Sequence, residues 1–364
     1  MSEAIPIQNL YYLLCYAWDQ LAEGEIVDIA ADDSKTLTEL FGRVLSHGTQ
    51  RLVRRGFDRG YLVESEETPR LRGRIDMTAS MKTQSWERGR MVCEFDELSH
   101  NVLHNRILKT TLEDLWHAEG IGKETRDLIH RQLESLRSVD RVHLTSGLFR
   151  RVHLHRNNRF YRFLLNICEL LYDSRLPEQR DGKSRFRDYV RDPKRMPYVF
   201  ERFVKNFYNR EQTKFDVTSI QLKWNAKGEL GDLAVLPVMQ TDVSLWSSER
   251  SIILDCKFYK EAMSGWHGSE RIHAGNLYQL YSYLRNAEER KGWEGSEGIL
   301  LYPAVKGGFD HKFTIEGHPV RVVSVNLDQP WQAIHEQLLC VLDLASNSKL
   351  VRKRYLRRKI DDQE

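Results

Sequence analysis

The clearest pattern along the chain is a pair of short runs of strand-forming residues joined by a polar turn. The first run covers residues 241–246, and the second covers residues 251–258. The second run contains three consecutive apolar residues, Ile252, Ile253 and Leu254. Such a run, bounded by turn residues, is typical of a buried strand. We therefore predict a β-hairpin over residues 241–258.

Most of the remaining pattern has the period of amphipathic helices and short strands. A capping-box sequence, Thr36-Leu-Thr-Glu39, marks the start of one helix, which is predicted to end near Arg54. The other predicted helices cover residues 7–21, 103–117, 124–136, 158–172, 196–208, 276–290 and 330–345. The other predicted strands cover residues 61–64, 70–77, 91–95, 142–154, 220–224, 298–302 and 320–325.

These elements predict an α+β and α/β protein with two domains, and 364 residues are enough for two cores. Residues 1–172 form a domain of mixed helices and strands. Residues 173–197 form a charged linker that contains Pro and Gly. Residues 198–345 form an α/β/α domain. The basic residues 346–364 form a tail that either follows a nucleic-acid backbone or is a solvated chain end.

Composition limits the class of protein. Hydrophobic residues make up 41% of the chain and charged residues 29%, which is typical of globular domains. The net charge is only +3, so any surface that binds nucleic acid must be local. The five cysteines lack the spacing of a zinc site or a disulfide framework. Neither a signal peptide nor a membrane-spanning run is visible, so we expect a cytoplasmic protein without a membrane partner.

Two carboxylates and a lysine lie on the predicted hairpin. Asp242 is at the start of the first strand. Asp255 and Lys257 are two residues apart near the end of the second strand, so their side chains point to one face. Carboxylate oxygens suit Mg²⁺, and a lysine beside them orients or deprotonates an attacking water. The pattern favours phosphodiester cleavage, although Asp-x-Lys alone is also a common tripeptide at solvated strand ends.

Two predicted helices carry further candidate residues. Glu201 lies on the helix over residues 196–208 and offers a third carboxylate. Gln279 and Tyr283 are four residues apart, so they share one face of the later helix. The order Glu, Asp, Asp-x-Lys, Gln-x-x-x-Tyr resembles the PD-(D/E)XK nuclease superfamily. The Pro of the nominal motif is absent, because Thr241 precedes Asp242.

This resemblance implies roles for the candidate residues. Asp242 and Asp255 would bind Mg²⁺, or alternatively Mn²⁺, with the backbone carbonyl of Cys256 and the carboxylate of Glu201 as further ligands. Lys257 would position the attacking water and stabilise charge in the transition state. The remaining residues of the pattern would orient the site or the DNA backbone, and these are Gln279 and Tyr283.

Several phrases outside the nuclease motif resemble the McrC family, the nuclease subunits of the McrBC 5-methylcytosine-dependent restriction systems. The resemblance extends over roughly residues 5–345. It rests on Ile-Pro-Ile-Gln-Asn-Leu-Tyr-Tyr-Leu-Leu-Cys-Tyr-Ala-Trp from Ile5, on Gly73-Arg74-Ile75, Phe95-Asp96-Glu97-Leu98 and Asn105-Arg106-Ile107-Leu108-Lys109, and on Asn276-Leu-Tyr-Gln-Leu280.

Membership in this family implies a partner. McrC-like chains work with hexamers of an McrB-like AAA+ GTPase that binds double-stranded methylated DNA. Their N-terminal domain inserts into the ring and stimulates GTP hydrolysis, and their nuclease domain cuts both strands. The chain lacks a phosphate-binding loop of the Gly-x-x-x-x-Gly-Lys-Ser/Thr type, so we expect no nucleotide to be bound by this chain itself.

Two alternatives remain open from the sequence. In one, the chain is a non-cleaving activator of a ring GTPase with a degenerate nuclease site, which the intact motif argues against. In the other, it is a stand-alone DNA-repair nuclease or a passive DNA-binding module. Mg²⁺-dependent cleavage by the isolated chain would indicate the repair nuclease, and DNA affinity without cleavage would indicate the binding module.

Overall fold

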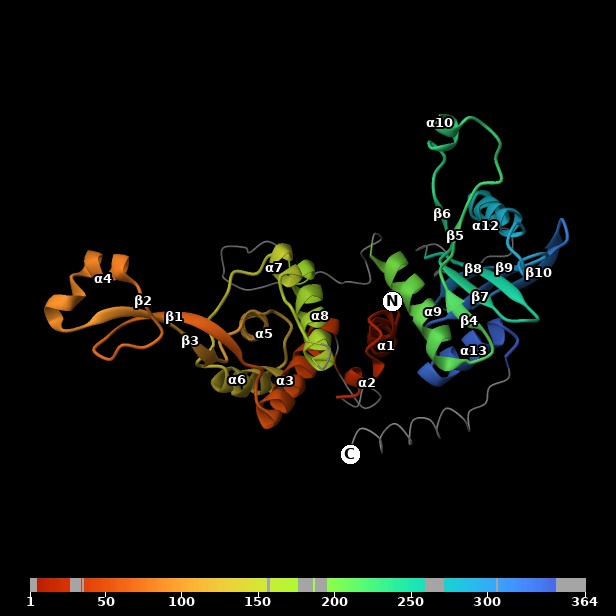
Figure 1. Ribbon diagram of the computed structural model, residues 1–364. Coiled ribbons are helices and arrows are strands. Elements are labelled where there is room, and N and C mark those ends of the chain that lie inside the picture. Colours follow the sequence, from red (N-terminus) through yellow and green to blue (C-terminus); the bar gives the residue numbers. More distant parts are fainter. Residues whose placement is uncertain are drawn as a thin grey trace. The chain divides into compact units, whose positions relative to one another are not determined.

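The computed structural model describes residues 5–26, 34, 36–155, 158–175, 186, 195–258, 272–305 and 307–344. The chain divides into two compact units (Figure 1). One unit combines Met1–Leu21 with Asp188–Glu364, and the other is Ala22–Arg187. The predicted basic tail and most of the predicted linker lie outside the described residues. No helix in the described part of the chain is long and apolar enough to cross a membrane.

The first helix, α1 (Ile7–Ala17), belongs to the C-terminal unit, so the prediction that residues 1–172 form one domain differs from the observed division. Its aromatic face packs against α9 (Met196–Glu211). The ring of Tyr16 lies 5.8 Å from that of Phe203 and 5.6 Å from that of Phe207. Periodicity predicts such an apolar face, but it does not say which distant helix will cover it.

A six-stranded mixed sheet forms the centre of the C-terminal unit, with the strand order β10-β11-β9-β8-β7-β4. The pairs β8–β9 and β9–β11 are parallel, and the remaining pairs are antiparallel. The predicted hairpin is confirmed as β7 and β8. The strands are β4 (Asp216–Thr218), β7 (Val243–Trp246), β8 (Ser251–Cys256), β9 (Glu297–Ala304), β10 (Asp310–Ile315) and β11 (His318–Asn326).

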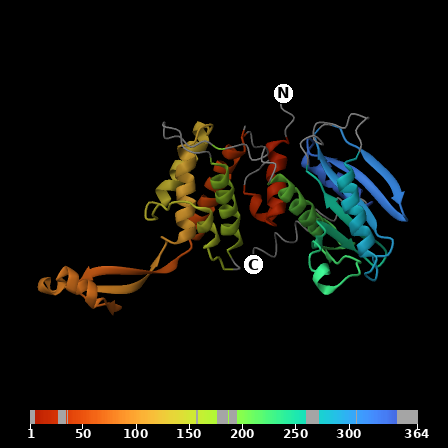
Figure 2. The same cartoon turned by 90° about the horizontal axis from the view of Figure 1, so that it is seen from above.

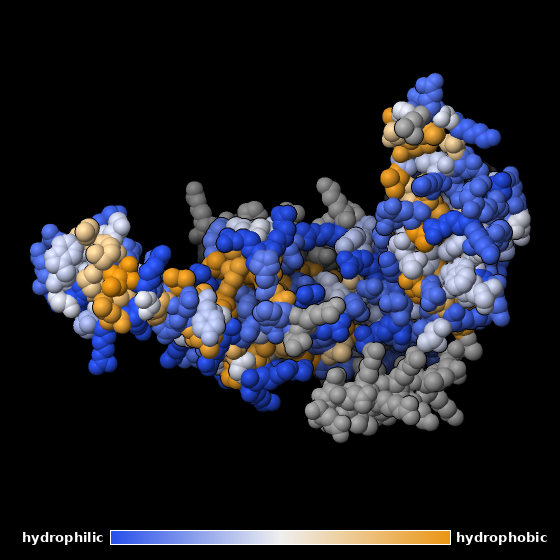
Figure 3. Space-filling view, viewed as in Figure 1, coloured by the Kyte–Doolittle hydropathy of each residue, from blue (hydrophilic) through white to orange (hydrophobic). Residues whose placement is uncertain are grey.

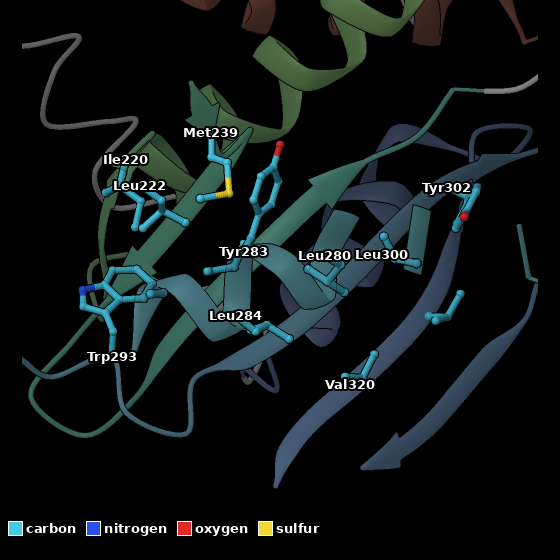
Figure 4. Close-up of a cluster of buried hydrophobic side chains, with 13 residues drawn as sticks. Ile220, Leu222, Met239, Leu280, Tyr283, Leu284, Trp293, Leu300, Tyr302 and Val320 are labelled. Carbon is cyan, nitrogen blue, oxygen red and sulfur yellow. The ribbon is translucent and has the colours of Figure 1, made fainter. Parts of the chain in front are cut away.

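Helices cover both faces of this sheet (Figures 1 and 2). On one face, α12 (Ala274–Ala287) packs its leucines against β8 and β9 (Figure 4). Ile253 of β8 faces α12, so its neighbours Ile252 and Leu254 point to the opposite face of the sheet. They are fully buried as well, so both faces of β8 are covered. The other helices that contact the sheet are α9 and α13 (Trp331–Val341), and the Tyr208 hydroxyl joins them by donating to the Leu338 carbonyl oxygen.

The segment from β5 to β6 forms a projection, and the chain returns from it through Asp242 into strand β7 of the hairpin. The short strands β5 (Gln221–Leu222) and β6 (Met239–Gln240) pair at its base, and it contains the short helix α10 (Leu230–Leu233). Apolar side chains are visible on its surface (Figure 3). Of the predicted strand 220–224, only Gln221 and Leu222 are strand residues, and they pair with β6 in a separate two-stranded sheet.

The second unit has a helical body and a β-arm. The predicted capping box is confirmed, since Thr36 Oγ1 accepts a hydrogen bond from the Glu39 N–H at 3.1 Å. The prediction of a strand over residues 142–154 is wrong, because this segment has no ladder partner and contains a helical turn instead. The helices of this part of the chain are α2 (Leu21–Gly24), α3 (Leu37–Arg55), α5 (Leu103–Trp116), α6 (Lys123–Ser135), α7 (Ser146–Arg150) and α8 (Arg159–Ser174).

Residues 60–99, called the arm below, extend away from the helices of their own unit (Figures 1 and 2). Gly73 makes the close approach that its place in a strand pattern predicts. Its φ is +63°, and a Cβ atom there would lie 2.2 Å from the Glu94 carbonyl oxygen. The arm contains β1 (Gly60–Thr68), β2 (Arg74–Ile75), α4 (Met77–Thr83), the 3₁₀ helix η2 (Ser85–Arg88) and β3 (Met91–Ser99).

Candidate active site

The two hairpin carboxylates meet where the β7–β8 ladder ends. Val243 pairs with Leu254, so Asp242 and Asp255 follow one position beyond the last pair. Asp255 is 1% exposed. The Asp242 carboxylate accepts a hydrogen bond from the Cys256 N–H, with 2.7 Å between Oδ2 and N. The structure therefore brings together the two acids that the sequence pattern predicts.

Lys257 links these acids to helix α12. Its Nζ lies 2.7 Å from Asp255 Oδ2, and its side chain is only 13% exposed. The same Nζ donates to Gln279 Oε1 at 2.8 Å, and Gln279 Nε2 donates to the Tyr283 hydroxyl at 2.8 Å. Four predicted residues thus form one chain of contacts from the sheet to the helix.

The position of α12 is fixed by close packing against the sheet. Leu280 and Leu284 are fully buried among the residues of the core cluster (Figure 4). A Cβ atom on Gly298 of β9 would lie 2.9 Å from Leu284 Cδ1, so helix and strand approach where the strand has no side chain. Because α12 is held in this way, Gln279 and Tyr283 are held next to Lys257.

Burial and mutual repulsion disfavour negative charge in the site. Burial, followed by the charge of Asp242, raises the pKa of Asp255 to about 7, even though Lys257 acts in the opposite direction. Burial also raises the pKa of Asp242, against the hydrogen bond from Cys256. Burial and the charge of Asp242 raise the pKa of Glu201 on α9, so this carboxyl group is an electrostatic neighbour of the pair.

The residues present fit a divalent cation. Asp255 Oδ1 is buried and accepts no hydrogen bond from the described residues. Buried carboxylate oxygens without a donor are costly unless a cation neutralises them. Two carboxylates suffice for Mg²⁺, which usually keeps several waters. Within the described ranges, no group of three or more His, Cys, Asp and Glu side chains lies close enough to hold a metal, so the structure brings Glu201 near the pair without forming a cluster of three carboxylates.

Lys205 and Ser219, which the sequence pattern did not predict, form hydrogen bonds that reach the backbone of Asp242. Lys205 Nζ donates to Ser219 Oγ at 2.9 Å, and Ser219 Oγ donates to the Asp242 carbonyl oxygen at 2.6 Å. Lys205 is one helical turn after Glu201, so the i, i+4 spacing was a signal that could have indicated it. Ser219 carries no comparable signal in the sequence.

Comparison with known proteins identifies the family. The family described as "McrBC 5-methylcytosine restriction system component" matches residues 7–303. A relative from Escherichia coli (strain K12), named "Type IV methyl-directed restriction enzyme EcoKMcrBC", is 35% identical over 341 residues, which cover 93% of this chain and 97% of that protein.

A solved structure supports the fold. The structure is described as a refined half-complex from a tetradecameric assembly of Thermococcus gammatolerans McrB AAA+ hexamers with bound McrC. The match covers 93% of this chain and 76% of that chain, with a TM-score of 0.59 and 17% sequence identity. With a family match over most of its length and a full-length relative above 30% identity, this chain belongs to the McrBC 5-methylcytosine restriction system component family.

Proposed function

We propose that this chain is the DNA endonuclease subunit of a modification-dependent restriction system and that it cleaves methylated DNA with Mg²⁺. The observation that carries the proposal is the buried Asp255, whose Oδ1 has no donor among the described residues and whose Oδ2 meets the Lys257 ammonium at 2.7 Å. A structural ion pair has no need of a second, partly buried acid beside it, whereas two neighbouring carboxylates are a usual ligand set for Mg²⁺.

Asp242, Asp255 and the backbone carbonyl of Cys256 would hold Mg²⁺, and Mn²⁺ would substitute for it. When bound, such a cation polarises a phosphoryl oxygen and lowers the pKa of a bound water. The sheet order, with the acids at the end of a hairpin and helices on both faces, supports assignment to the PD-(D/E)XK nucleases.

The chain's own residues then supply orientation and charge. Lys257 places a positive charge beside the scissile phosphate and orients the attacking water. Gln279 fixes the direction of the Lys257 ammonium by accepting its hydrogen bond, and Tyr283 fixes Gln279. Glu201 is half-buried, and its raised pKa makes it a stronger proton acceptor toward water than an exposed glutamate.

We infer further that the chain works with a ring of an McrB-like AAA+ GTPase, which recognises the methylated DNA and whose hydrolysis this chain stimulates. The solved assembly that shares this fold contains McrB hexamers with bound McrC, which supports this partner. The arm supports it independently, because it exposes large apolar side chains that a chain acting alone would not need. These are Tyr61, Val63, Leu71, Met77, Met81, Trp86 and Leu98.

The decisive experiment uses the full chain with its cognate ring GTPase, GTP and Mg²⁺ on methylated and unmethylated plasmids. Wild type should cut only the methylated plasmid, and Asp255→Ala should cut neither. If Asp255→Ala still cuts the methylated plasmid, the site assignment is wrong. Stimulated GTP hydrolysis without cutting by the wild type would favour the activator alternative, and cutting by the chain alone would favour a repair nuclease.

A further inference from the structure

The segment that carries Asp242, where β6 leads into β7, contains one residue more than the segment opposite it, where β4 leads into β5. Thr218 pairs with Ser244 in the β4–β7 ladder, and Gln221 pairs with Gln240 in the β5–β6 ladder. Between these pairs, one strand advances three positions (218 to 221) and the other advances four (240 to 244). The extra residue forms a β-bulge, and bulges next to active sites redirect a side chain.

Side-chain hydroxyls take over hydrogen bonds inside this bulge. The Ile220 N–H donates to Thr241 Oγ1 at 3.0 Å, and the Thr241 N–H donates to the Ile220 carbonyl oxygen at 3.1 Å. Thr241 Oγ1 also lies 2.7 Å from Ser244 Oγ. Side chains three positions apart face opposite sides of a regular strand, so this contact requires the chain to turn between Thr241 and Ser244.

The backbone and the carboxylate of Asp242 are held from opposite directions. Its carbonyl oxygen accepts from Ser219 Oγ, which in turn accepts from Lys205 Nζ on α9. Its carboxylate accepts from the Cys256 N–H on β8. Contacts from both neighbouring segments therefore hold Asp242, one set on its backbone and one on its carboxylate.

We propose that Thr241, Ser219 and Lys205 are positioning residues that hold the bulge so that the Asp242 carboxylate stays on the Cys256 N–H beside Asp255. The expected effect on metal binding rests on the proposed nuclease function. The Thr241 N–H is used in the bulge, and a proline at this position would have no N–H to donate. The hydroxyl and N–H of Thr241 thus replace the proline of the nominal motif.

The test measures two properties of the full chain that do not depend on cleavage. Binding of Mn²⁺ to metal-free protein is followed by electron paramagnetic resonance. Hydrogen exchange is followed on the peptide that contains Cys256. Thr241→Val and Ser219→Ala should weaken Mn²⁺ binding about 10- to 100-fold, as loss of groups that orient metal ligands does. They should also speed exchange of the Cys256 amide, because its acceptor moves.

Two further variants are controls. Thr241→Ser keeps the hydroxyl and should restore both properties. Ser324→Ala removes another buried hydroxyl of the same sheet, one that bonds Phe309 far along the sheet from Asp242, and should change neither property.

The outcomes separate this inference from the proposed function. Unchanged exchange and unchanged Mn²⁺ affinity in both Thr241→Val and Ser219→Ala would overturn the inference. If wild type binds no Mn²⁺, the proposed metal site fails, and the exchange of the Cys256 amide then decides the role of the bulge by itself. Faster exchange in Thr241→Val with normal exchange in Thr241→Ser would support the inference whether or not the wild type binds Mn²⁺.

Discussion

Two antiparallel pairs of the chain, β7–β8 and β1–β3, have charged residues in or next to their strands, and they differ in burial. In the β7–β8 hairpin, every residue from Ser251 to Asp255 is buried. In the β1–β3 pair of the arm, no residue of β1 is buried, and Tyr61 and Val63 are 74% and 70% exposed, although Val92 and Cys93 of β3 are buried. The same secondary structure therefore gives charges a low-dielectric setting in one unit and a solvated one in the other.

This difference determines what the charges do. The arm pairs Arg74 with Glu94 and Arg88 with Glu67 across its strands and turns. Such exposed pairs contribute little to stability, since water and salt screen them. The pair of Asp255 and Lys257 is screened much less, so it shifts pKa values and suits chemistry. The exposed apolar groups of the arm are the feature that suits the partner contact proposed for it.

The largest effect should follow from removing the buried lysine. Lys257→Ala should lower cleavage by about a thousandfold or more, because stabilisation of phosphoryl charge in such a site is worth several kcal/mol. GTP hydrolysis by the cognate ring GTPase should still be stimulated. The measurement compares both activities in one preparation, with Lys312→Ala on the exposed face of edge strand β10 as the matched control. Equal losses of cleavage and of GTPase stimulation would show that the two activities are not divided between the two units.

The opposite change removes the arm. Gly60 and Ser99 pair at its base, so residues 61–98 can be replaced by a short glycine-containing turn. This variant should lose stimulation of the GTPase, and with it cleavage of methylated plasmid, because the exposed apolar surface is gone. Its Mn²⁺ binding should match that of wild type. If the variant without the arm still stimulates the GTPase, the contact with the partner must lie outside the arm.

A third change tests the burial of charge directly. The pKa of Asp255 is raised in the folded protein from 3.8 to about 7, so the native state keeps the proton in this window and the unfolded state does not. Metal-free protein should therefore lose stability as the pH rises from about 4 to 7. Asp255→Asn should be more stable than wild type by about 2–4 kcal/mol at pH 8.

This stability difference should shrink toward pH 5 and also on addition of Mg²⁺ to wild type, because protonation or a cation removes the cost of the buried charge. Thermal unfolding at the two pH values is the measurement. A difference that does not depend on pH would mean that Asp255 titrates normally and that the site is more hydrated than its burial indicates.

A smaller effect should follow from replacing Glu211, whose carboxylate links α1 to the rest of its unit. Glu211 accepts from the Tyr16 hydroxyl at 2.7 Å and lies 3.3 Å from His335 Nε2. Burial acts to raise its pKa, but the bonds from His335 and Tyr16 outweigh burial and lower it. Glu211→Ala should cost about 1–3 kcal/mol at pH 7.

The contribution of Glu211 should be fully present above its unfolded-state pKa of 4.5 and should be lost as the pH falls through the lower folded-state pKa. Denaturant unfolding at pH 7 and pH 3.5 measures it, and Glu336→Ala on the exposed side of α13 is the control. An equal cost at both pH values would indicate a packing effect of the side chain alone.

The smallest effect is expected in the arm. Arg88→Ala breaks the contact with Glu67, a hydrogen bond that lowers the pKa of this partly exposed carboxylate. The melting temperature should not change measurably, because the pair is solvated. A clear destabilisation would show that arm charges act like those of the buried sheet and would contradict the comparison above.

Local pattern was enough to predict the hairpin, the helix with Gln279 and Tyr283, and therefore most of the candidate site. These features depend on periods of two and 3.6 residues that neighbouring side chains themselves set. The short strand β4 was missed because three residues carry no such period. The helical turn at Ser146–Arg150 was misassigned because strand-forming residues adopt a strand only where a partner strand exists.

The bulge and the attachment of α1 could not be predicted for a different reason. The bulge is a mismatch between two registers, and it becomes visible only when both pairs of strands are known. The partner of Tyr16 is about 190 positions away, as the hydrogen bond between Asn206 and the Tyr16 carbonyl oxygen illustrates. Long-range pairing of this kind leaves no trace in the pattern of one segment.

The attachment of α1 has a consequence for biosynthesis. The unit Ala22–Arg187 is inserted between α1 and α9, so α1 leaves the ribosome long before the helix that covers it. At usual translation rates of about 5–20 residues per second, this delay is roughly 10 to 40 s. The inserted unit has its whole sequence available first and can fold first. The unit with the candidate site is completed last, so a prematurely terminated chain would contain the arm but not the assembled candidate site.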